Sequence, residues 1–511
     1  MAAVAITVSI VMVACSGAPE KTNGSRNDTL IIAENEQPAT FDPVQADNST
    51  VDEVVIPAYD TLITFNEDSK LVGELATEWK LVDGGRSIQF TLRDGPTFHD
   101  GSRVTSADVK YTLDRIKDIN VGVASQLTAY DTTDVDDPTH FTIRLTAANV
   151  PFLGALSRVY ILNSKLVEAN AGADNGQKWL ATHDAGSGPY QLKSYTPNQQ
   201  AKFTQYKDYW GGFDGQAKQV IFKYMATSTE RSSLQNGDVD IAMDVAPNDW
   251  GTFESNEKFT VDKANTNVML YVFFKMKNGL TSNKYLREAI SYAYDYEQHK
   301  SAILKDAGQL AKGVMPEGMQ CYTGSTPQPT FDLAKAKSLM AKSGLGGVKL
   351  RLTYLKATAE MEQSAAVLQS ALMKIGVTLE LQAITYPQFV DEAKTNATTP
   401  DMGMIYAFPT SPDPDSILYQ NFNSAFINAG QNWGGFRNSA VDELTEKAQS
   451  VTDEEKRCGI YGEVEKLIAA ETPTINLSNP QYVTVFSKRL TGYKYDASHQ
   501  STVDVYRIKV S

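Results

Sequence analysis

Residues 348–381 read VKLRLTYLKATAEMEQSAAVLQSALMKIGVTLEL, and this stretch decides the fold. Residues 348–352 alternate between apolar and polar side chains, as in a half-buried strand. Residues 359–374 carry apolar residues at helical spacing, and Gly376 follows where a helix end favours glycine. Residues 377–381 then alternate again. The order strand, helix, strand predicts a βαβ unit with parallel strands and a right-handed crossover.

The chain beyond this unit extends the same architecture. Residues 401–408 predict a further strand, so the C-terminal half contains an open α/β sheet. Ligands bind such sheets beyond the carboxyl ends of the strands. Residues 409–415 directly follow the predicted strand, and we therefore expect them to lie near a ligand cleft.

Earlier segments mix the two kinds of secondary structure. Residues 87–93 alternate as a strand, and residues 105–108 resemble a capping box that opens a helix. No low-complexity tract, short repeat or obvious linker interrupts residues 29–511. Any lobes must therefore be interwoven or tightly joined.

An apolar run, residues 2–14, precedes Cys15 and a polar stretch. The run falls short of the ~20 residues that a membrane span needs, which is typical of an export signal. Residues 12–15 (MVAC) resemble a bacterial lipobox, in which a signal peptidase cuts before a lipidated cysteine. We therefore expect a signal peptide at 1–14, lipidation of Cys15 and a flexible tether at 15–27. The alternative is an ordinary secretory signal with an incidental cysteine.

The composition fits a soluble exported protein and argues against nucleic-acid binding. The 511 residues include 47 Lys and Arg against 61 Asp and Glu, a formal net charge of -14. Phosphate binding needs clustered basic residues, and none are clustered here. Length alone predicts two or three folding units, at roughly 100 to 200 residues each.

Two further cysteines, Cys321 and Cys458, would lie in an oxidising compartment. Cys458 points away from the apolar stripe of its predicted helix, so core packing alone does not explain it. The two cysteines either form a disulfide or remain independent thiols.

Sequence motifs of enzymes and metal sites are missing. The chain contains no HExxH, CxxC, GxSxG, GxxxxGK[ST] or GxGxxG, and its five histidines are scattered. We expect no catalytic residues, no metal site and no cofactor. A secreted hydrolase, the alternative, would need a nucleophile or metal cluster that these motifs do not supply.

Several medium-length motifs occur in one order along the chain. They are 71–79 (LVGELATEW), 90–101 (FTLRDGPTFHDG), 105–109 (TSADV), 186–190 (GSGPY) and 234–242 (LQNGDVDIA). Together they resemble the signature of the family 5 solute-binding proteins, the oligopeptide- and dipeptide-binding type subunits of ABC importers. The resemblance covers nearly all of the mature chain.

This resemblance implies an α/β, two-lobed, type II periplasmic-binding-protein-like fold with an extra small domain on lobe one. It implies ligand capture by lobe closure and delivery to permease subunits in the membrane, without catalysis or a cofactor. Monomers are usual for the family. The implied limits are 28–57, 186–267 and 487–511 for lobe one, 58–185 for the extra domain and 268–486 for lobe two.

The resemblance also points to ligand-binding residues. Peptide-binding members place an aspartate a few residues before an acidic-Pro pair, where it meets the ligand's α-amino group. Aligning that pair with Asp413 and Pro414 puts Thr410 at the aspartate position. A hydroxyl cannot supply an ion pair, so a free peptide N-terminus would be held less well. Asp413 or Asp415 would either substitute or stabilise the turn.

Five other residues are candidates for the same cleft. Glu34 and Asn35 lie in a loop that falls where the family lines its cleft, and the alternative is a solvated loop. Tyr406, Phe408 and Trp433 are candidate pocket aromatics, and the alternative is packing inside the lobe.

The sequence therefore predicts a lipid-anchored extracytoplasmic receptor of an ABC importer, with peptide as the leading ligand. An oligosaccharide or another polar solute is the rival ligand class. A surface sensor or signal-peptide receptor that feeds no transporter is a different function that the same fold allows.

Overall fold

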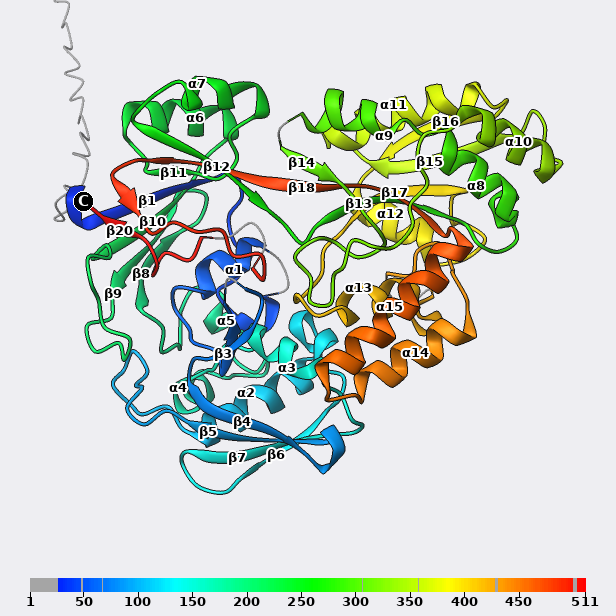
Figure 1. The fold of residues 1–511 in the computed structure, drawn as a ribbon. Helices are drawn as coiled ribbons and strands as arrows, with labels where there is room; N and C mark the ends of the chain where they lie inside the picture. The colour runs from blue at the N-terminus through cyan, green and yellow to red at the C-terminus, as the bar shows by residue number, and fades with distance from the viewer. Residues whose placement is uncertain are drawn as a thin grey trace, which may run out of the picture.

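The computed structural model describes residues 26–46, 49–66, 68–305, 307–356, 358–427, 431–499 and 503–511. The expected signal peptide, Cys15 and most of the expected tether lie outside them. The described chain forms a 12-stranded sheet that runs through two halves and a separate four-stranded sheet (Figure 1). We call the half with β1 lobe one, the half with β15 lobe two and the four-stranded part the small domain.

Lobe two contains the βαβ unit that the sequence predicts. β15 (Lys349–Leu355) and β16 (Thr378–Ile384) are parallel, and α11 (Ala359–Met373) connects them. β17 (Met402–Ala407) is parallel to β15 on its other side. The parallel pairing and the strand within 401–408 are therefore confirmed.

Helices cover both faces of the lobe-two sheet. Met404 of β17 packs in a core on one face, and the adjacent Ile405 packs in a core on the other. β13 (Met269–Phe274), which lies between β17 and β18, is buried along its whole length. The helices of the first face are α8 (Lys284–Ala293), α10 (Leu333–Ser343) and α11, and those of the second are α12 (Tyr386–Ala393), α13 (Asp415–Phe422), α14 (Ser439–Gln449) and α15 (Glu454–Glu471).

Lobe one places three parallel strands side by side. β1 (Thr29–Glu34) lies between β10 (Gln219–Tyr224) and β11 (Ile241–Ala242) and is parallel to both. Their carboxyl ends therefore meet at one edge of the sheet. Four further elements complete the lobe: the antiparallel strands β9 (Gln200–Gln205) and β8 (Tyr190–Thr196), and the helices α6 (Thr227–Asn236) and α7 (Trp250–Glu254).

One strand, β18 (Thr474–Ser487), belongs to both lobes. Its first half pairs with β13, and its second half pairs with β11 and with β12 (Phe259–Asn265). Figure 1 shows it running from one half of the molecule into the other. The chain crosses between the lobes a second time, from β12 to β13, so two neighbouring segments join the lobes.

The small domain packs α2 (Ser106–Ile119) against an antiparallel sheet. The predicted capping box is confirmed, because Thr105 and Asp108 bond reciprocally at the start of α2. Arg115 of α2 makes a buried two-bond ion pair with Asp42 of lobe one, at 2.9 and 2.6 Å, and so ties the two parts together. The sheet order is β4 (Ala76–Val82), β5 (Ser87–Leu92), β7 (His140–Leu145) and β6 (Tyr130–Val135).

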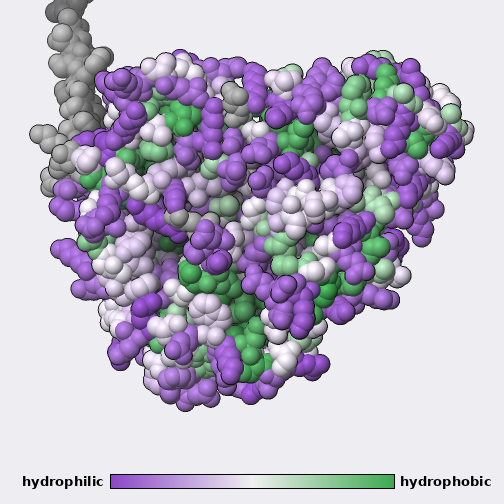
Figure 2. Space-filling model, viewed as in Figure 1, coloured by the Kyte–Doolittle hydropathy of each residue, from purple (hydrophilic) through white to green (hydrophobic). Residues whose placement is uncertain are grey.

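Short elements fill the connections. They are α1 (Ser49–Val55), β2 (Ile63–Phe65), β3 (Leu71–Gly73), α3 (Phe152–Ala155), α4 (Ser164–Ala169), α5 (Gln177–Leu180), α9 (Tyr296–Gln298), β14 (Gly308–Leu310), β19 (Leu490–Thr491) and β20 (Lys509–Val510). Figure 2 shows hydrophilic side chains over most of one face, with hydrophobic ones in separate patches. Within the described ranges, no helix combines the length and apolar character needed to cross a bilayer.

Cys321 and Cys458 form a disulfide within lobe two, with their Cα atoms 5.0 Å apart. Cys458 lies on α15, and Cys321 lies in the long segment between β14 and α10. The bond joins residues that are 137 positions apart in the sequence. It therefore fixes a segment with little secondary structure to a long helix.

We expect C321S or C458S to lower the free energy of unfolding by about 2 to 4 kcal/mol, because the unfolded chain loses a long closed loop. Denaturant titration with and without reductant measures the effect. Reductant should destabilise the wild type but not the C321S/C458S double variant. Equal unfolding curves for wild type with and without reductant would contradict a stabilising disulfide.

Candidate ligand-binding site

The ends of the parallel strands of the two lobes face each other across the region where β18 and the β12–β13 segment pass between the lobes. β17 and β18 run in the same direction, because both are antiparallel to β13. β11 is antiparallel to β18, and β1 and β10 share the direction of β11. The carboxyl ends of β15, β16 and β17 therefore point toward lobe one, and those of β1, β10 and β11 point toward lobe two. Open α/β sheets bind ligands at such ends.

A cavity of about 300 Å³ lies between the small domain and lobe two. Amide and hydroxyl side chains dominate its lining, and the buried Oε1 of Gln126 receives no hydrogen bond. A ligand N–H or O–H could satisfy that oxygen. The main polar residues of the lining are Gln126, Asn149, Thr410, Gln420, Gln431 and Gln449.

Direct contacts hold the small domain against lobe two around this cavity. The Val150 backbone N–H donates to the Gln449 carbonyl at 2.7 Å. The Gln320 side-chain amide donates to the Ser69 carbonyl at 2.8 Å. The cavity is therefore enclosed by two separate parts of the chain that touch at its sides.

The segment 409–415 lies at the cavity, where the sequence places it, and Thr410 is part of the lining. Asp413 accepts two bonds from Arg457, at 2.7 and 2.6 Å, and one from the Asp415 backbone N–H at 2.9 Å. Asp413 is thus already paired and stabilises the turn. A ligand ammonium would have to compete with Arg457 for it.

Asp415 also lines the cavity but has weaker partners. Gln449 donates to its two oxygens at 3.3 and 3.2 Å, and the Tyr461 hydroxyl donates at 3.3 Å. Burial and the nearby Asp413 charge raise the pKa of Asp415 to about 7. At neutral pH this carboxyl is therefore only partly ionised.

Tyr406 and Phe408 lie together at the end of β17, with ring centroids 5.9 Å apart. The Tyr406 hydroxyl donates to Glu360 at 2.6 Å, and Glu360 also accepts a bond from Ser478 of β18. Phe408 is 53% exposed, which is unusual for a large apolar side chain. Phe408 is therefore available to a ligand, whereas Tyr406 is held by the lobe.

Trp433 lies on the other face of the lobe-two sheet from Tyr406. Its ring packs edge-on against Phe389, with centroids 5.8 Å apart. The free space beside it is only about 10 Å³. The structure does not bring Trp433 together with the other candidates, and its surroundings match packing inside the lobe.

Glu34 and Asn35 lie at the carboxyl end of β1, on the lobe-one side. Glu34 is only 7% exposed, whereas Asn35 is exposed and its side chain lies 3.5 Å from the Thr227 hydroxyl. Burial and Glu53 raise the pKa of Glu34 well above its usual value. Sequence reasoning missed Glu53, Gln126 and Glu360, because each becomes a neighbour of the site only through the tertiary fold.

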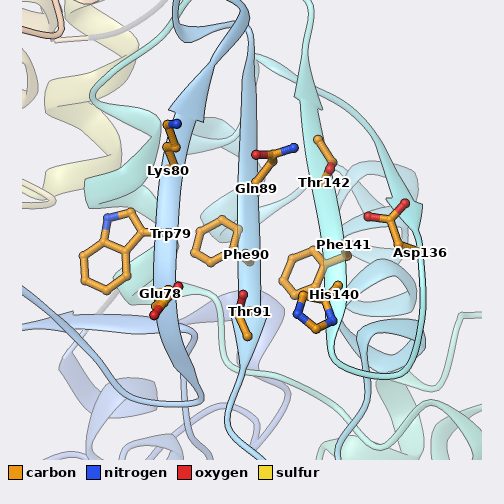
Figure 3. A pocket seen from close by; sticks show the side chains of 10 residues that line it. All are labelled: Glu78, Trp79, Lys80, Gln89, Phe90, Thr91, Asp136, His140, Phe141 and Thr142. Atoms are coloured by element: carbon orange, nitrogen blue, oxygen red, sulfur yellow. The ribbon is translucent and has the colours of Figure 1, made fainter.

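A larger hollow of about 690 Å³ lies elsewhere, on the small domain (Figure 3). Figure 3 shows side chains of the neighbouring strands β4, β5 and β7 around it, together with Asp136. All of its lining residues belong to the small domain, and Lys80, Gln89 and His140 are exposed. Binding sites enclose their ligands with convergent polar groups, so the cavity between the small domain and lobe two is the better candidate.

The architecture, two lobes with a small domain on lobe one, is that of type II periplasmic binding proteins. The structure of the ABC transporter substrate binding protein CtaP from Listeria monocytogenes matches with a TM-score of 0.85 at 23% identity. The match covers 94% of this chain and 99% of that one. The predicted fold class is therefore confirmed.

The family model of the bacterial extracellular solute-binding proteins, family 5 Middle, matches residues 70–429, and this chain belongs to that family. The probable D,D-dipeptide-binding periplasmic protein DdpA of Escherichia coli (strain K12) is 27% identical over 479 residues, 92% of each chain. The oligopeptide-binding protein AppA of Bacillus subtilis (strain 168) is 24% identical over 544 residues, 100% of this chain and 97% of AppA. These findings confirm the resemblance that the sequence motifs indicate.

The two aspartates of the cavity should respond to substitution in opposite ways. The folded-state pKa of Asp415, about 7, lies above its ordinary value of 3.8, so the folded protein binds the extra proton. Its contribution therefore lowers stability as the pH rises from about 4 to 7. D415N should remove this penalty and be more stable than wild type above pH 7, by up to about 4 kcal/mol.

D413N is the matched control, because it leaves Arg457 buried without its partner. It should cost about 3 to 5 kcal/mol at neutral pH. Denaturant titration of both variants between pH 4 and 8 measures the difference. A D415N gain that did not grow with pH would contradict the assignment of the raised pKa to Asp415.

Proposed function

We propose that this protein is the extracytoplasmic substrate-binding subunit of an ABC importer and that its ligand is a peptide, which it delivers to permease subunits in the membrane. The observation that carries the proposal is the polar cavity enclosed between the small domain and lobe two, at the carboxyl ends of the lobe-two strands. Peptides present amide groups that its Gln and Asn side chains can pair. The family membership and the names of DdpA and AppA support the same reading.

The side chains that line this cavity also suit a second class of ligand. Amide and hydroxyl side chains also pair with sugar hydroxyls, so an oligosaccharide is the rival ligand. We propose no catalysis and no cofactor, in line with the binding role of the family. Monomeric behaviour and anchoring through lipidated Cys15, after removal of residues 1–14, also belong to this proposal.

We further propose that the lobes close around the ligand by bending at the two crossing segments. The proposed limits are 28–57, 186–267 and 487–511 for lobe one, 58–185 for the small domain and 268–486 for lobe two, with β18 reaching into both lobes. The bond from Gln320 to Ser69 joins lobe two to the small domain, and we assign it to the closed state. A ligand drives closure only if it binds the closed state better than the open one.

A thermal-shift screen of the mature domain tests the ligand class. Short peptides should raise the melting temperature, since a ligand at 100 times its Kd stabilises by about 2.7 kcal/mol. Oligosaccharides of similar size serve as the comparison. A clear saccharide response without any peptide response would rule out the peptide assignment while leaving the receptor fold unaffected.

Gln320→Ala tests closure. The variant should bind a peptide hit about 3 to 10 times more weakly, because one neutral hydrogen bond of the closed state is lost. Without ligand its melting temperature should equal that of wild type, because the open state lacks this bond. Calorimetric titration measures the affinity, and thermal melting measures the stability without ligand. If the ligand-free variant loses as much stability as the variant loses in binding free energy, the bond is not specific to the closed state.

A further inference from the structure

Four carboxylates gather at the lobe-one edge that faces lobe two. Glu34 ends β1, Glu53 lies on α1, Glu230 lies on α6, and Asp244 follows β11 by two residues. Among the described residues, none of the four forms an ion pair with a Lys, Arg or His side chain. We call this group the acidic subsite.

The four side chains are linked to one another and partly unsatisfied. The Asp244 backbone N–H donates to Oε2 of Glu230 at 3.1 Å, and the Glu34 and Glu53 carboxyls lie close enough to influence each other's pKa. Oε1 of Glu34 and Oε1 of Glu230 are buried and receive no hydrogen bond. These two residues are only 7% and 0% exposed. Buried carboxylate oxygens without donors are costly, so they call for an explanation.

The electrostatics of the subsite favour an added positive charge. Burial is the largest cause that raises the pKa of Glu53 to about 8 and of Glu230 to about 7, and neighbouring carboxylates raise both further. Burial and the same neighbours also raise the pKa of Glu34, and burial raises that of Asp244. A cation would relieve this repulsion and supply the missing donors.

The surroundings favour an organic cation over a metal ion. Within the part of the chain that the structure describes, no three His, Cys, Asp or Glu side chains are arranged to hold one metal ion. Tyr224, which ends β10, and Tyr482 of β18 are partly exposed beside the subsite, and the buried Tyr224 hydroxyl oxygen has no partner. Aromatic faces and dispersed carboxylates suit an ammonium or guanidinium group.

We propose that the acidic subsite binds a cationic group of the ligand, an ammonium or a guanidinium, from the lobe-one side. This inference rests on the proposed function, since it assigns part of the ligand of that receptor. The bound cation would favour ionisation of these carboxyls, which would then supply the negative charge that Thr410 cannot supply in lobe two. For a peptide the cation is either the α-ammonium or a basic side chain, and both share this chemistry.

Calorimetric titration of the mature domain with matched peptides tests the proposal. Ala-Lys-Ala, Ala-norleucine-Ala and their N-acetylated forms separate the two sources of charge. We expect removal of the recognised charge to weaken binding to the wild type about tenfold or more. E34Q and E230Q should lose this preference for the charged peptide, because each replaces a carboxyl that can ionise with a neutral amide of nearly the same volume.

E74Q is the matched control. Glu74 is a half-buried carboxyl whose pKa is also raised to about 8, mainly by burial, but it accepts a bond from Thr61 and lies outside the acidic subsite. E74Q should keep the wild-type preference. If N-acetylation alone weakens binding to the wild type, the recognised cation is the α-ammonium. If replacing lysine by norleucine alone weakens it, the recognised cation is the lysine side chain.

Two results would overturn the inference while leaving peptide binding intact. One is equal wild-type affinity for charged and neutral peptides, and the other is a charge preference that survives in both E34Q and E230Q. If no peptide binds, the proposed function fails instead, and butylammonium and methylguanidinium then probe the subsite directly. If these cations stabilise the wild type but not E34Q, the result supports the subsite. If they stabilise both proteins equally, the result excludes it.

Discussion

The whole arrangement depends on β18, which is hydrogen-bonded into both lobes. Its pairing partner changes between Pro480, which lies opposite β14 of lobe two, and Gln481, which lies opposite β12 of lobe one. Beside this point the Thr266 hydroxyl donates to the Pro480 carbonyl, and the Asn479 side chain donates to the Val268 carbonyl. The two crossing segments are thus bonded to each other, which supports the proposed bending about this region.

The same strand sets the chemistry of the region between the lobes. Because β18 is antiparallel to β11 and to β13, it turns the carboxyl ends of both sets of parallel strands toward the crossing. Charged residues near these ends fall into two groups. Asp413 is neutralised by Arg457, whereas Glu34 and Glu230 lack any basic partner in the described chain. The paired charges stabilise the scaffold, and the carboxyls without a basic partner are the ones that we propose for binding.

Local pattern was enough to predict much of lobe two. The alternation at 348–352 and 377–381 and the helix between them gave the correct parallel unit, and the residues around Thr105 gave the correct helix start. The insertion of β13 between β17 and β18 could not be read from the sequence, because it joins residues more than 100 positions apart. The acidic subsite was equally hidden, since Glu53, Glu230 and Asp244 sit on separate elements without a common spacing.

The ligand-contact candidates that the sequence suggested by residue type alone turn out to have different surroundings. Phe408 keeps an exposed ring at a strand end, while Trp433 is enclosed by its own lobe. Thr410 lines the cavity without a charge, and the carboxyl groups between the lobes lie instead on lobe one and at Asp415, where burial raises their pKa values. If the charged contact is made on lobe one, it can form before the lobes close. In the proposed closure, the energy would then come from the amide and hydroxyl groups of lobe two, which would meet the ligand only in the closed state.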